Sequence, residues 1–353
     1  MLTIQARNVT EALYLGLEHL KASGIWHETR TGKVLEYPHP VTTKYLCPKE
    51  RVLFSPIRDA NPFFHLFEAL WMLGGQEDVD YVRFFNKRMI EYSDDGWRLN
   101  GAYGYRWRQY FHSDQLDLAI SHLIEDPNSR RAVVTMWDSE DLRRAIEDYK
   151  DVPCNTHIYF KIKNTKLSMT VLCRSNDIIW GTYGANAVHF SILQEYMASQ
   201  IGIEVGDYYH VSDSYHAYEE PFYKMLPILK RHQHGAGLWY DSYLGLNTDG
   251  MHYTPTPIFE NATQADVDIE KFLGYTRTFM NQIIRFPPAP PEYANRFFTK
   301  TAHKMFLAWH IGQVHREYKD AISTAKEIEA LDWRKASIEW LERRAEKWES
   351  KKL

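Results

Sequence analysis

The sequence predicts an α/β protein in which helices flank a large sheet. Its 353 residues, 44% of them hydrophobic, are enough to bury a large core. Up to about residue 245, segments with helical periodicity alternate with short apolar segments typical of strands, and a highly charged helical pattern follows. We therefore expect a main domain at residues 1–245 and a helical C-terminal extension, residues 246–353, packed on it.

The composition of the chain limits which classes of molecule it could bind. The chain has 42 Lys and Arg against 46 Asp and Glu, a net charge of −4. This balance provides no field for a nucleic-acid polymer, although a nucleotide monomer stays open as a ligand. The N-terminus has no apolar signal segment and no apolar run approaches membrane length, so we expect a soluble cytoplasmic protein without membrane contact.

Cysteine and histidine usage argues against a disulfide framework or a metal site. The three cysteines, Cys47, Cys154 and Cys173, are odd in number and lack CxxC spacing, which indicates a reducing compartment. His232 and His234 have no acidic or cysteine neighbour, so no metal is expected there. One cysteine is therefore free to act as a nucleophile.

The first helix is predicted over residues 9–22, where alanines and leucines recur at roughly helical spacing. Residues 28–33 then form a polar segment that predicts a turn. This turn could carry Arg30 to an anion, or it could be an ordinary surface loop.

A strongly apolar helix is predicted over residues 61–75, with Asn61 as its N-cap and Pro62 in its first turn. Glu68 lies in the middle of it, among apolar residues that cover most of the circumference. A carboxylate in such low-dielectric surroundings has the profile of a general acid or base. The alternative is a glutamate at the edge of the core without a chemical role.

The next segments end in turns that could present side chains to a ligand. Residues 101–107 form a turn rich in glycine and tyrosine around Tyr103. After a helix over residues 115–125, Arg130-Arg131 directly precede a strand over residues 132–137. Two arginines at such a junction suit a phosphate by bidentate hydrogen bonding, and an exposed surface pair is the alternative.

The central part of the chain predicts a strand–strand–helix–strand unit. Its strands cover residues 157–163 and 166–173, and a short hairpin-like connection joins them. A turn containing two glycines then leads into a helix over residues 187–201, and another strand covers residues 205–212. The unit carries Cys154 just before its first strand.

Cys154 follows a proline at the start of this unit. Alone, such a cysteine is more often a buried structural thiol; partly exposed and near arginines such as Arg174, it would have a lowered pKa and act as a nucleophile. Asn186 could bond both a donor and an acceptor on the edge of a base. Together with Glu68, these residues fit attack on an electron-poor heterocycle whose phosphate is held by arginines.

Several motifs occur in the order and spacing of a known family: Pro153-Cys154, Arg174-Ser175-Asn176-Asp177, Gly181 with Asn186, Gly206-Asp207-Tyr208 and His216-Ala217-Tyr218. From about Arg30 to Tyr218 the chain resembles the folate-dependent thymidylate synthase family. That family includes the pyrimidine-nucleotide hydroxymethylases, many of them from phages. The resemblance implies a thymidylate-synthase-like fold, with a mixed and mostly antiparallel sheet whose back forms a homodimer interface.

The resemblance also implies roles for individual residues. Cys154 matches the nucleophile that adds to C6 of the pyrimidine, so that C5 can attack the methylene group of 5,10-methylenetetrahydrofolate. Glu68 matches the glutamate that manages protons, Tyr103 the tyrosine near the nucleophile, and Asp177 the aspartate that contacts folate. The implied nucleotide ligands are Arg30, Arg174 and Ser175 for phosphate, Asn186 for the base, His216 and Tyr218 for the sugar 3′-hydroxyl, and Arg130 and Arg131 reaching the other subunit's site.

Departures from the family bear on the product. The tryptophan that the family places near folate is absent from residues 87–90, although Trp97 could replace it. Asn155 replaces the usual histidine after the nucleophile, and a charged helical region replaces the C-terminal lid. Hydride transfer needs stacked folate and excluded water, so we expect water to add instead and give a hydroxymethyl product. Reductive methylation, as in thymidylate synthase, is the alternative.

The base is the second open question. The turn before Asn186 is one residue longer than usual, so either Ala185 or Asn186 faces the base. An asparagine matches the N3–H donor and O4 acceptor of uracil, which favours dUMP, whereas a flipped amide would accept cytosine. The predicted activity is 5-hydroxymethylation of dUMP, with dCMP or CMP as alternative substrates and the host cytoplasm as location if the protein is viral. A non-enzymatic nucleotide- or RNA-binding member is a further alternative, against which the retained Cys154 and Glu68 argue.

Overall fold

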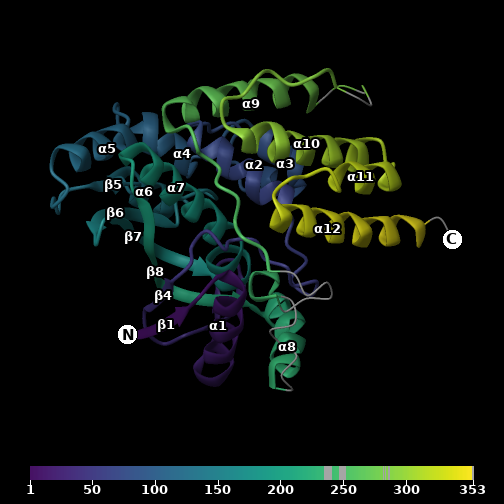
Figure 1. The fold of residues 1–353 in the computed structure, drawn as a ribbon. Helices are drawn as coiled ribbons and strands as arrows, with labels where there is room; N and C mark the ends of the chain where they lie inside the picture. The colour runs from purple at the N-terminus through teal and green to yellow at the C-terminus, as the bar shows by residue number, and fades with distance from the viewer. Residues whose placement is uncertain (234–240, 246–251, 281, 283, 285–286, 352–353) are drawn as a thin grey trace.

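The strands of the described residues form one eight-stranded sheet (Figure 1), in the order β1-β4-β8-β7-β6-β5, with β3 also pairing β8 and β2 pairing β3. In this computed structural model the described residues are 1–233, 241–245, 252–280, 282, 284 and 287–351. The pairs β1–β4 and β7–β8 are parallel and the other pairs are antiparallel, which confirms the predicted mixed, mostly antiparallel sheet. The strands are β1 (Leu2–Ala6), β2 (Ile25–Thr29), β3 (Gly32–Glu36), β4 (Val41–Tyr45), β5 (Val133–Thr135), β6 (Asn155–Lys163), β7 (Lys166–Asp177) and β8 (Glu204–Tyr218).

Helices surround the sheet and extend the molecule away from it. Figure 1 shows α1 beside the N-terminal strands and α9 to α12 grouped on the far side from them. The α-helices of the described residues are α1 (Val9–Ser23), α2 (Pro62–Leu73), α3 (Val79–Phe85), α4 (Tyr103–Tyr105), α5 (Gln115–Glu125), α6 (Ser139–Ile146), α7 (Asn186–Ile201), α8 (Glu219–Gln233), α9 (Ala265–Met280), α10 (His303–Trp309), α11 (Tyr318–Ala325) and α12 (Leu331–Glu349).

Helices α2 and α7 form the centre of the core and pack on one another. As predicted, the Asn61 side chain caps α2 by accepting from the Phe64 backbone N–H at 3.1 Å, and Pro62 lies in the first turn. Every residue of α2 except Glu68 is buried, and α7 is buried over nearly its whole length. Helices that are buried on nearly all sides belong to the core, so the side chains of these two helices are held in place by packing.

Two segments differ from their predicted form. Residues 28–33 are not a free turn, because β2 and β3 form a hairpin with Arg30 and Thr31 at its tip. No clear strand signal is present in these residues, since β2 is largely exposed and polar. The predicted turn at residues 101–107 is helical, because α4 continues into a widened helical turn over Arg106–Tyr110.

The C-terminal helices pack on α2 through aromatic side chains. The Phe63 ring lies 5.4 Å from Trp309 and 5.6 Å from Trp340, and Phe67 lies 5.7 Å from Phe272, measured between ring centroids. These rings join α9, α10 and α12 to the core of the main domain, so the extension is packed on it. The boundary at residue 245 stays a prediction. No described helix combines the length and the apolar character that a membrane crossing requires.

Candidate active site

Cys154 lies immediately before β6 with its thiol half-buried. Arg174, on β7, donates from Nε to the Pro153 carbonyl at 3.0 Å and from Nη2 to the Val152 carbonyl at 2.9 Å. The guanidinium is therefore held against the segment that carries the nucleophile. Burial raises the pKa of Cys154, and Arg174 acts in the opposite direction. The expectation of a lowered pKa is wrong for the free protein, because the loss of solvation outweighs the nearby positive charge.

Tyr103 lies beside this thiol. Burial raises its pKa well above the ordinary value, the neighbouring Cys154 and Cys173 thiols add to the increase, and the Asn155 backbone N–H opposes it. The Tyr103 ring stacks on Phe190 of α7, with centroids 5.9 Å apart. The structure thus brings Tyr103 and Cys154 together, while the role of the phenol stays a prediction.

Glu68 faces a histidine that sequence reasoning missed. Its Oε2 lies 3.1 Å from His189 Nε2, and the two side chains are 12% and 4% exposed. Neither atom has a hydrogen-bond partner among the described residues, since the contact lacks hydrogen-bond geometry. The only signal in the sequence was a histidine one helical turn after Asn186, within the apolar first half of that helix. The pair offers a carboxylate and an imidazole that can hold and move a proton.

The proposed phosphate ligands of one chain meet at one edge. Arg30, at the tip of the β2–β3 hairpin, forms an exposed ion pair with Asp148 at 3.3 Å. Arg174 contacts the same connection a few residues further on, at Val152. Ser175 follows Arg174 on β7 and is paired with Ser214 of β8. Arg30 and Arg174 thus both contact the connection of residues 148–152 that precedes Cys154.

Arg130 and Arg131 are not part of this group. Both are exposed just before β5, where Val133 pairs with Tyr159 of β6, and continuing this antiparallel register places Arg131 opposite Lys161. Lys161 lies about seven strand residues from Cys154, or roughly 23 Å along β6. In the described residues neither arginine has an ion-pair partner. These side chains cannot reach the Cys154 of their own chain.

Asp177 ends β7 next to His216, with which it pairs in register on β8. Its carboxylate accepts from the backbone N–H groups of Ile179 and Trp180 at 2.7 and 2.8 Å. Burial raises the pKa of Asp177, while the two N–H groups and His216 act against the increase. Tyr218 bonds through its hydroxyl to Thr31 at 2.7 Å, which ties β8 to the hairpin that carries Arg30.

The longer turn before Asn186 is a widened helical turn, η3 (Ile178–Ala185), that is kinked at Tyr183 and Gly184, whose backbone angles are not helical. One additional residue is commonly accommodated in this way near functional sites. The Asn186 amide nitrogen donates to Asn176 Oδ1 at 3.3 Å. A Cβ on Gly181 would lie 2.5 Å from that same oxygen, so glycine permits the two amides to meet. Asn186, not Ala185, thereby carries a polar side chain that other side chains orient.

An aromatic ring and a buried arginine lie next to Asp177. Trp180 is 48% exposed, and the Arg58 guanidinium lies 4.4 Å from the centroid of its ring. Arg58 donates from Nε to the Ile179 carbonyl at 2.7 Å, and burial lowers its pKa to about 10. Trp97, considered above as a substitute for the family's tryptophan, is 76% exposed on a loop. A tryptophan beside Asp177 was not anticipated from the sequence.

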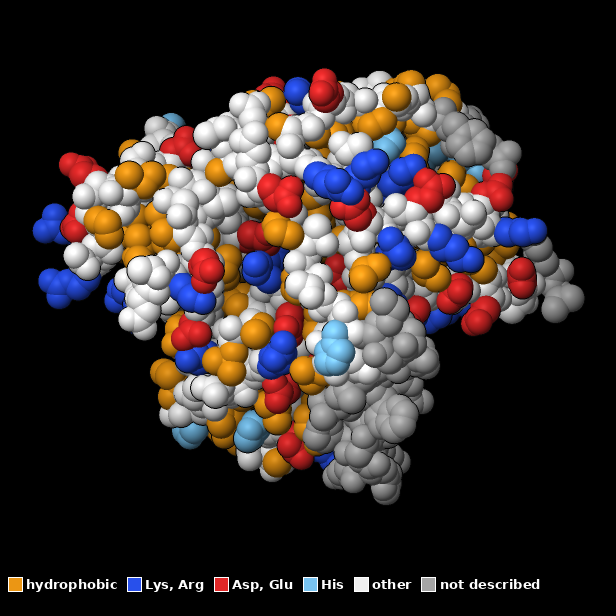
Figure 2. Space-filling view, in the orientation of Figure 1, with side chains coloured by type: hydrophobic (Ala, Val, Ile, Leu, Met, Phe, Trp, Pro, Cys, Tyr) orange, Lys and Arg blue, Asp and Glu red, His pale blue; other side chains and the backbone are white. Residues whose placement is uncertain are grey.

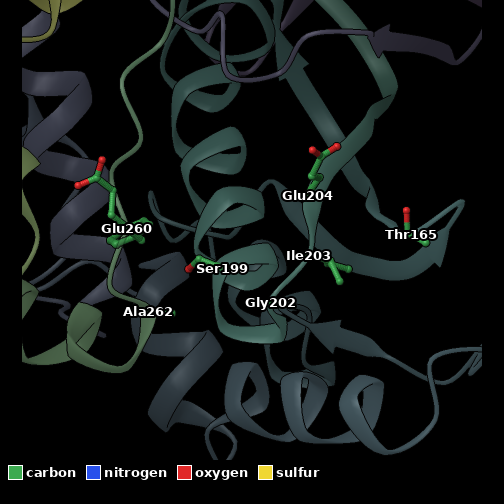
Figure 3. A pocket seen from close by; sticks show the side chains of 8 residues that line it. Thr165, Ser199, Gly202, Ile203, Glu204, Glu260 and Ala262 are labelled. Atoms are coloured by element: carbon green, nitrogen blue, oxygen red, sulfur yellow. The ribbon is translucent and has the colours of Figure 1, made fainter.

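A shallow hollow of about 600 Å³ lies elsewhere, at the C-terminal end of α7 (Figure 3). Its wall includes Ser199, Glu204 and Glu260 and none of the predicted site residues. Figure 2 shows acidic and basic side chains interspersed over the visible face. Among the described residues no group of three or more His, Cys, Asp or Glu side chains could hold a metal. The side chains of His232 and His234 lie outside the described residues.

Comparison with known proteins gives consistent matches. A family model described as thymidylate synthase matches residues 15–249. A deoxyuridylate hydroxymethyltransferase of Pseudomonas phage M6 is 42% identical over 100% of this chain and 97% of its own length. A protein of the same name from Delftia phage PhiW-14 is 33% identical over 80% of this chain and 76% of its own. The solved thymidylate synthase from T4 phage covers 63% of this chain and 80% of its own at a TM-score of 0.51 and 20% identity, which shows the fold.

These matches confirm the predicted fold and the predicted class of enzyme, a one-carbon transferase. The roles of the individual site residues stay predictions. With the family model matching well over half of the sequence and a relative aligned over its full length, the chain belongs to the thymidylate synthase family.

Proposed function

We propose that the protein transfers the methylene carbon of 5,10-methylenetetrahydrofolate to C5 of dUMP and lets water complete the reaction, giving 5-hydroxymethyl-dUMP. The names of the phage relatives support this substrate and product. The structural observation that carries the proposal is the Glu68–His189 pair, because its two facing atoms keep hydrogen-bonding capacity in a nearly buried position. Buried polar atoms of this kind suit a bound water.

Binding would begin at the phosphate. Arg30, Arg174 and Ser175 lie at the edge where the β2–β3 hairpin meets the connection before Cys154. A phosphate held there by two guanidiniums places the pyrimidine over the thiol. Asp177 offers a carboxylate to folate. The half-exposed Trp180 ring, supported by Arg58, offers a flat surface on which the folate ring system can stack.

The reaction would then use the groups around the base. The Cys154 thiolate adds to C6, and the electron pair that moves to C5 makes that carbon nucleophilic toward the methylene group. Glu68 and His189 accept and return the protons, including the proton lost from C5. Tetrahydrofolate leaves unoxidised, water adds to the exocyclic methylene group, and the Cys154 sulfur leaves C6 with its electrons.

In this proposal, a second copy of the chain completes the phosphate site. Arg130 and Arg131 cannot approach their own Cys154, yet both are exposed cations without ion-pair partners among the described residues. We infer a homodimer in which they complete the phosphate site of the other subunit. A cytoplasmic location is part of the same proposal.

Product analysis tests the function directly. The protein is incubated with dUMP and methylenetetrahydrofolate, and the nucleotide is examined by mass spectrometry while absorbance reports dihydrofolate. A product heavier than dUMP by a hydroxymethyl group, without dihydrofolate, is expected. A methyl product accompanied by dihydrofolate would show reductive methylation instead, and no nucleotide product with dUMP, dCMP or CMP would overturn the enzymatic proposal.

A further inference from the structure

Three buried side chains form a hydrogen-bonded relay that ends at the half-exposed Asn186. The Tyr208 hydroxyl bonds His210 Nδ1 at 2.7 Å, and His210 Nε2 bonds Asn176 Nδ2 at 2.7 Å. Asn176 Oδ1 then accepts from Asn186 Nδ2 at 3.3 Å. Tyr208, His210 and Asn176 are all 3% exposed or less, so water does not compete for these bonds.

Each bond in the relay restricts the next. Burial lowers the pKa of His210 to about 3, so the imidazole is neutral near pH 7. Because Nε2 accepts from the Asn176 amide, the proton of the neutral ring is on Nδ1 and is donated to Tyr208. The Asn176 amide nitrogen also donates to the Ser212 hydroxyl at 3.2 Å. Its nitrogen thus points toward β8, and its oxygen is left for Asn186.

The orientation of Asn176 determines what Asn186 can offer to a base. With one N–H directed to Asn176, Asn186 keeps a second N–H and its carbonyl oxygen, half-exposed at the N-terminus of α7. A donor beside an acceptor matches O4 and N3–H of uracil. Cytosine requires the amide to turn over, which would bring two carbonyl oxygens face to face where the 3.3 Å bond now lies.

We propose that Asn176 and His210 are positioning residues that hold the Asn186 amide in the orientation that accepts uracil and disfavours cytosine. The inference rests on the proposed function at the step of base recognition. Cytosine would be accepted only if both amides turned and His210 moved its proton to the other ring nitrogen. Discrimination between uracil and cytosine therefore depends on Asn176 and His210 behind the site, and not on Asn186 alone.

The decisive experiment compares two substitutions of similar size at one position. Asn176→Leu removes the oxygen that holds Asn186, whereas Asn176→Asp retains an acceptor at that place. Relative kcat/KM for dUMP over dCMP is measured for each, together with the Kd of both nucleotides by calorimetry. We expect Asn176→Leu to lower the dUMP preference about tenfold, which corresponds to about 1.4 kcal/mol, and Asn176→Asp to retain it within about threefold.

Controls separate positioning from simple loss of stability. Val171→Ala creates a cavity in the same strand outside the relay, and should lower Tm while leaving the preference unchanged. If Asn176→Leu does not fold, His210→Phe tests the same claim, since Asn176 then loses its acceptor and can turn over. An unchanged preference in the folded relay variants, or an equal change in Asn176→Asp and Asn176→Leu, would overturn the proposal. Failure of the wild-type protein to act on dUMP would instead overturn the proposed function.

Discussion

Glu68 on α2 and His189 on α7 face one another with Oε2 and Nε2 3.1 Å apart, in a position that is nearly closed to solvent. Because the pair lacks hydrogen-bond geometry, we expect a proton to pass between the two groups through a bound water, without either side chain leaving the core. The His65 ring lies 6.4 Å from the His189 ring, measured between centroids. Burial holds the pKa of His65 well below its ordinary value, so this imidazole is neutral near pH 7. In the proposed reaction we therefore expect proton transfer to depend on Glu68.

Glu68→Gln is expected to lower kcat about 100-fold, because the amide can bond His189 but cannot accept a proton. The Kd for dUMP should change by less than about threefold, since the phosphate and base ligands remain. Steady-state kinetics and calorimetry provide the two values. Glu125→Gln, on the exposed end of α5, is the matched control. A kcat within twofold of wild type would remove Glu68 from the mechanism.

The pH dependence of the reaction should follow the thiol of Cys154. Because burial raises its pKa, the thiolate is a small fraction at pH 7 and grows as pH increases toward the raised value. The kcat/KM for dUMP is therefore expected to rise between pH 7 and pH 9, by up to about tenfold per unit. Cys154→Ser should abolish turnover, while Cys47→Ser should retain it. A flat profile would mean that the Cys154 thiol of the free protein is already ionised at pH 7, which would contradict the raised pKa.

Mixing two inactive variants tests the composite site. Arg131→Ala impairs the phosphate site of the partner, and Cys154→Ala removes the nucleophile of its own chain. After unfolding and refolding together, half of the dimers should be mixed, and each mixed dimer has one site with both residues intact. About a quarter of wild-type activity should return. Recovery indistinguishable from zero would argue that Arg131 acts within its own subunit, whereas full activity of Arg131→Ala alone would mean that Arg131 has no role.

Stability should fall in mild acid in a way that depends on His210. The unfolded histidine binds a proton below its ordinary pKa of about 6.5, whereas the buried side chain resists protonation down to about 3, so the unfolded state gains protons in this window. His210 alone should cost about 2 kcal/mol of unfolding free energy at pH 5. Denaturant unfolding at pH 7 and pH 5 measures it. Between pH 7 and pH 5, His210→Gln should lose less unfolding free energy than wild type. The control His39→Gln, at an exposed position, should lose as much as wild type.

Local pattern was sufficient for the central elements. The Asn61 cap, the apolar run of α2 and the periodicity of α7 are properties of neighbouring residues, and each element lies where its pattern predicts it. The motif around Cys154 and Arg174 also followed from the sequence, because the two residues lie on strands joined by a short hairpin. Such contacts are determined within a few residues, which is the range over which sequence pattern is informative.

Long-range packing decided the rest. The β2–β3 hairpin has little strand signal of its own. Its strand β3 pairs with β8, and Arg30 at the tip of the hairpin forms an ion pair with Asp148. Desolvation, a property of the whole core, reversed the expected direction of the Cys154 pKa. The relay from His210 through Asn176 to Asn186 likewise joins β8, β7 and α7. The sequence alone determined which chemical groups this protein has, and only the tertiary structure decided which of them meet, because burial and strand pairing depend on residues far apart in the chain.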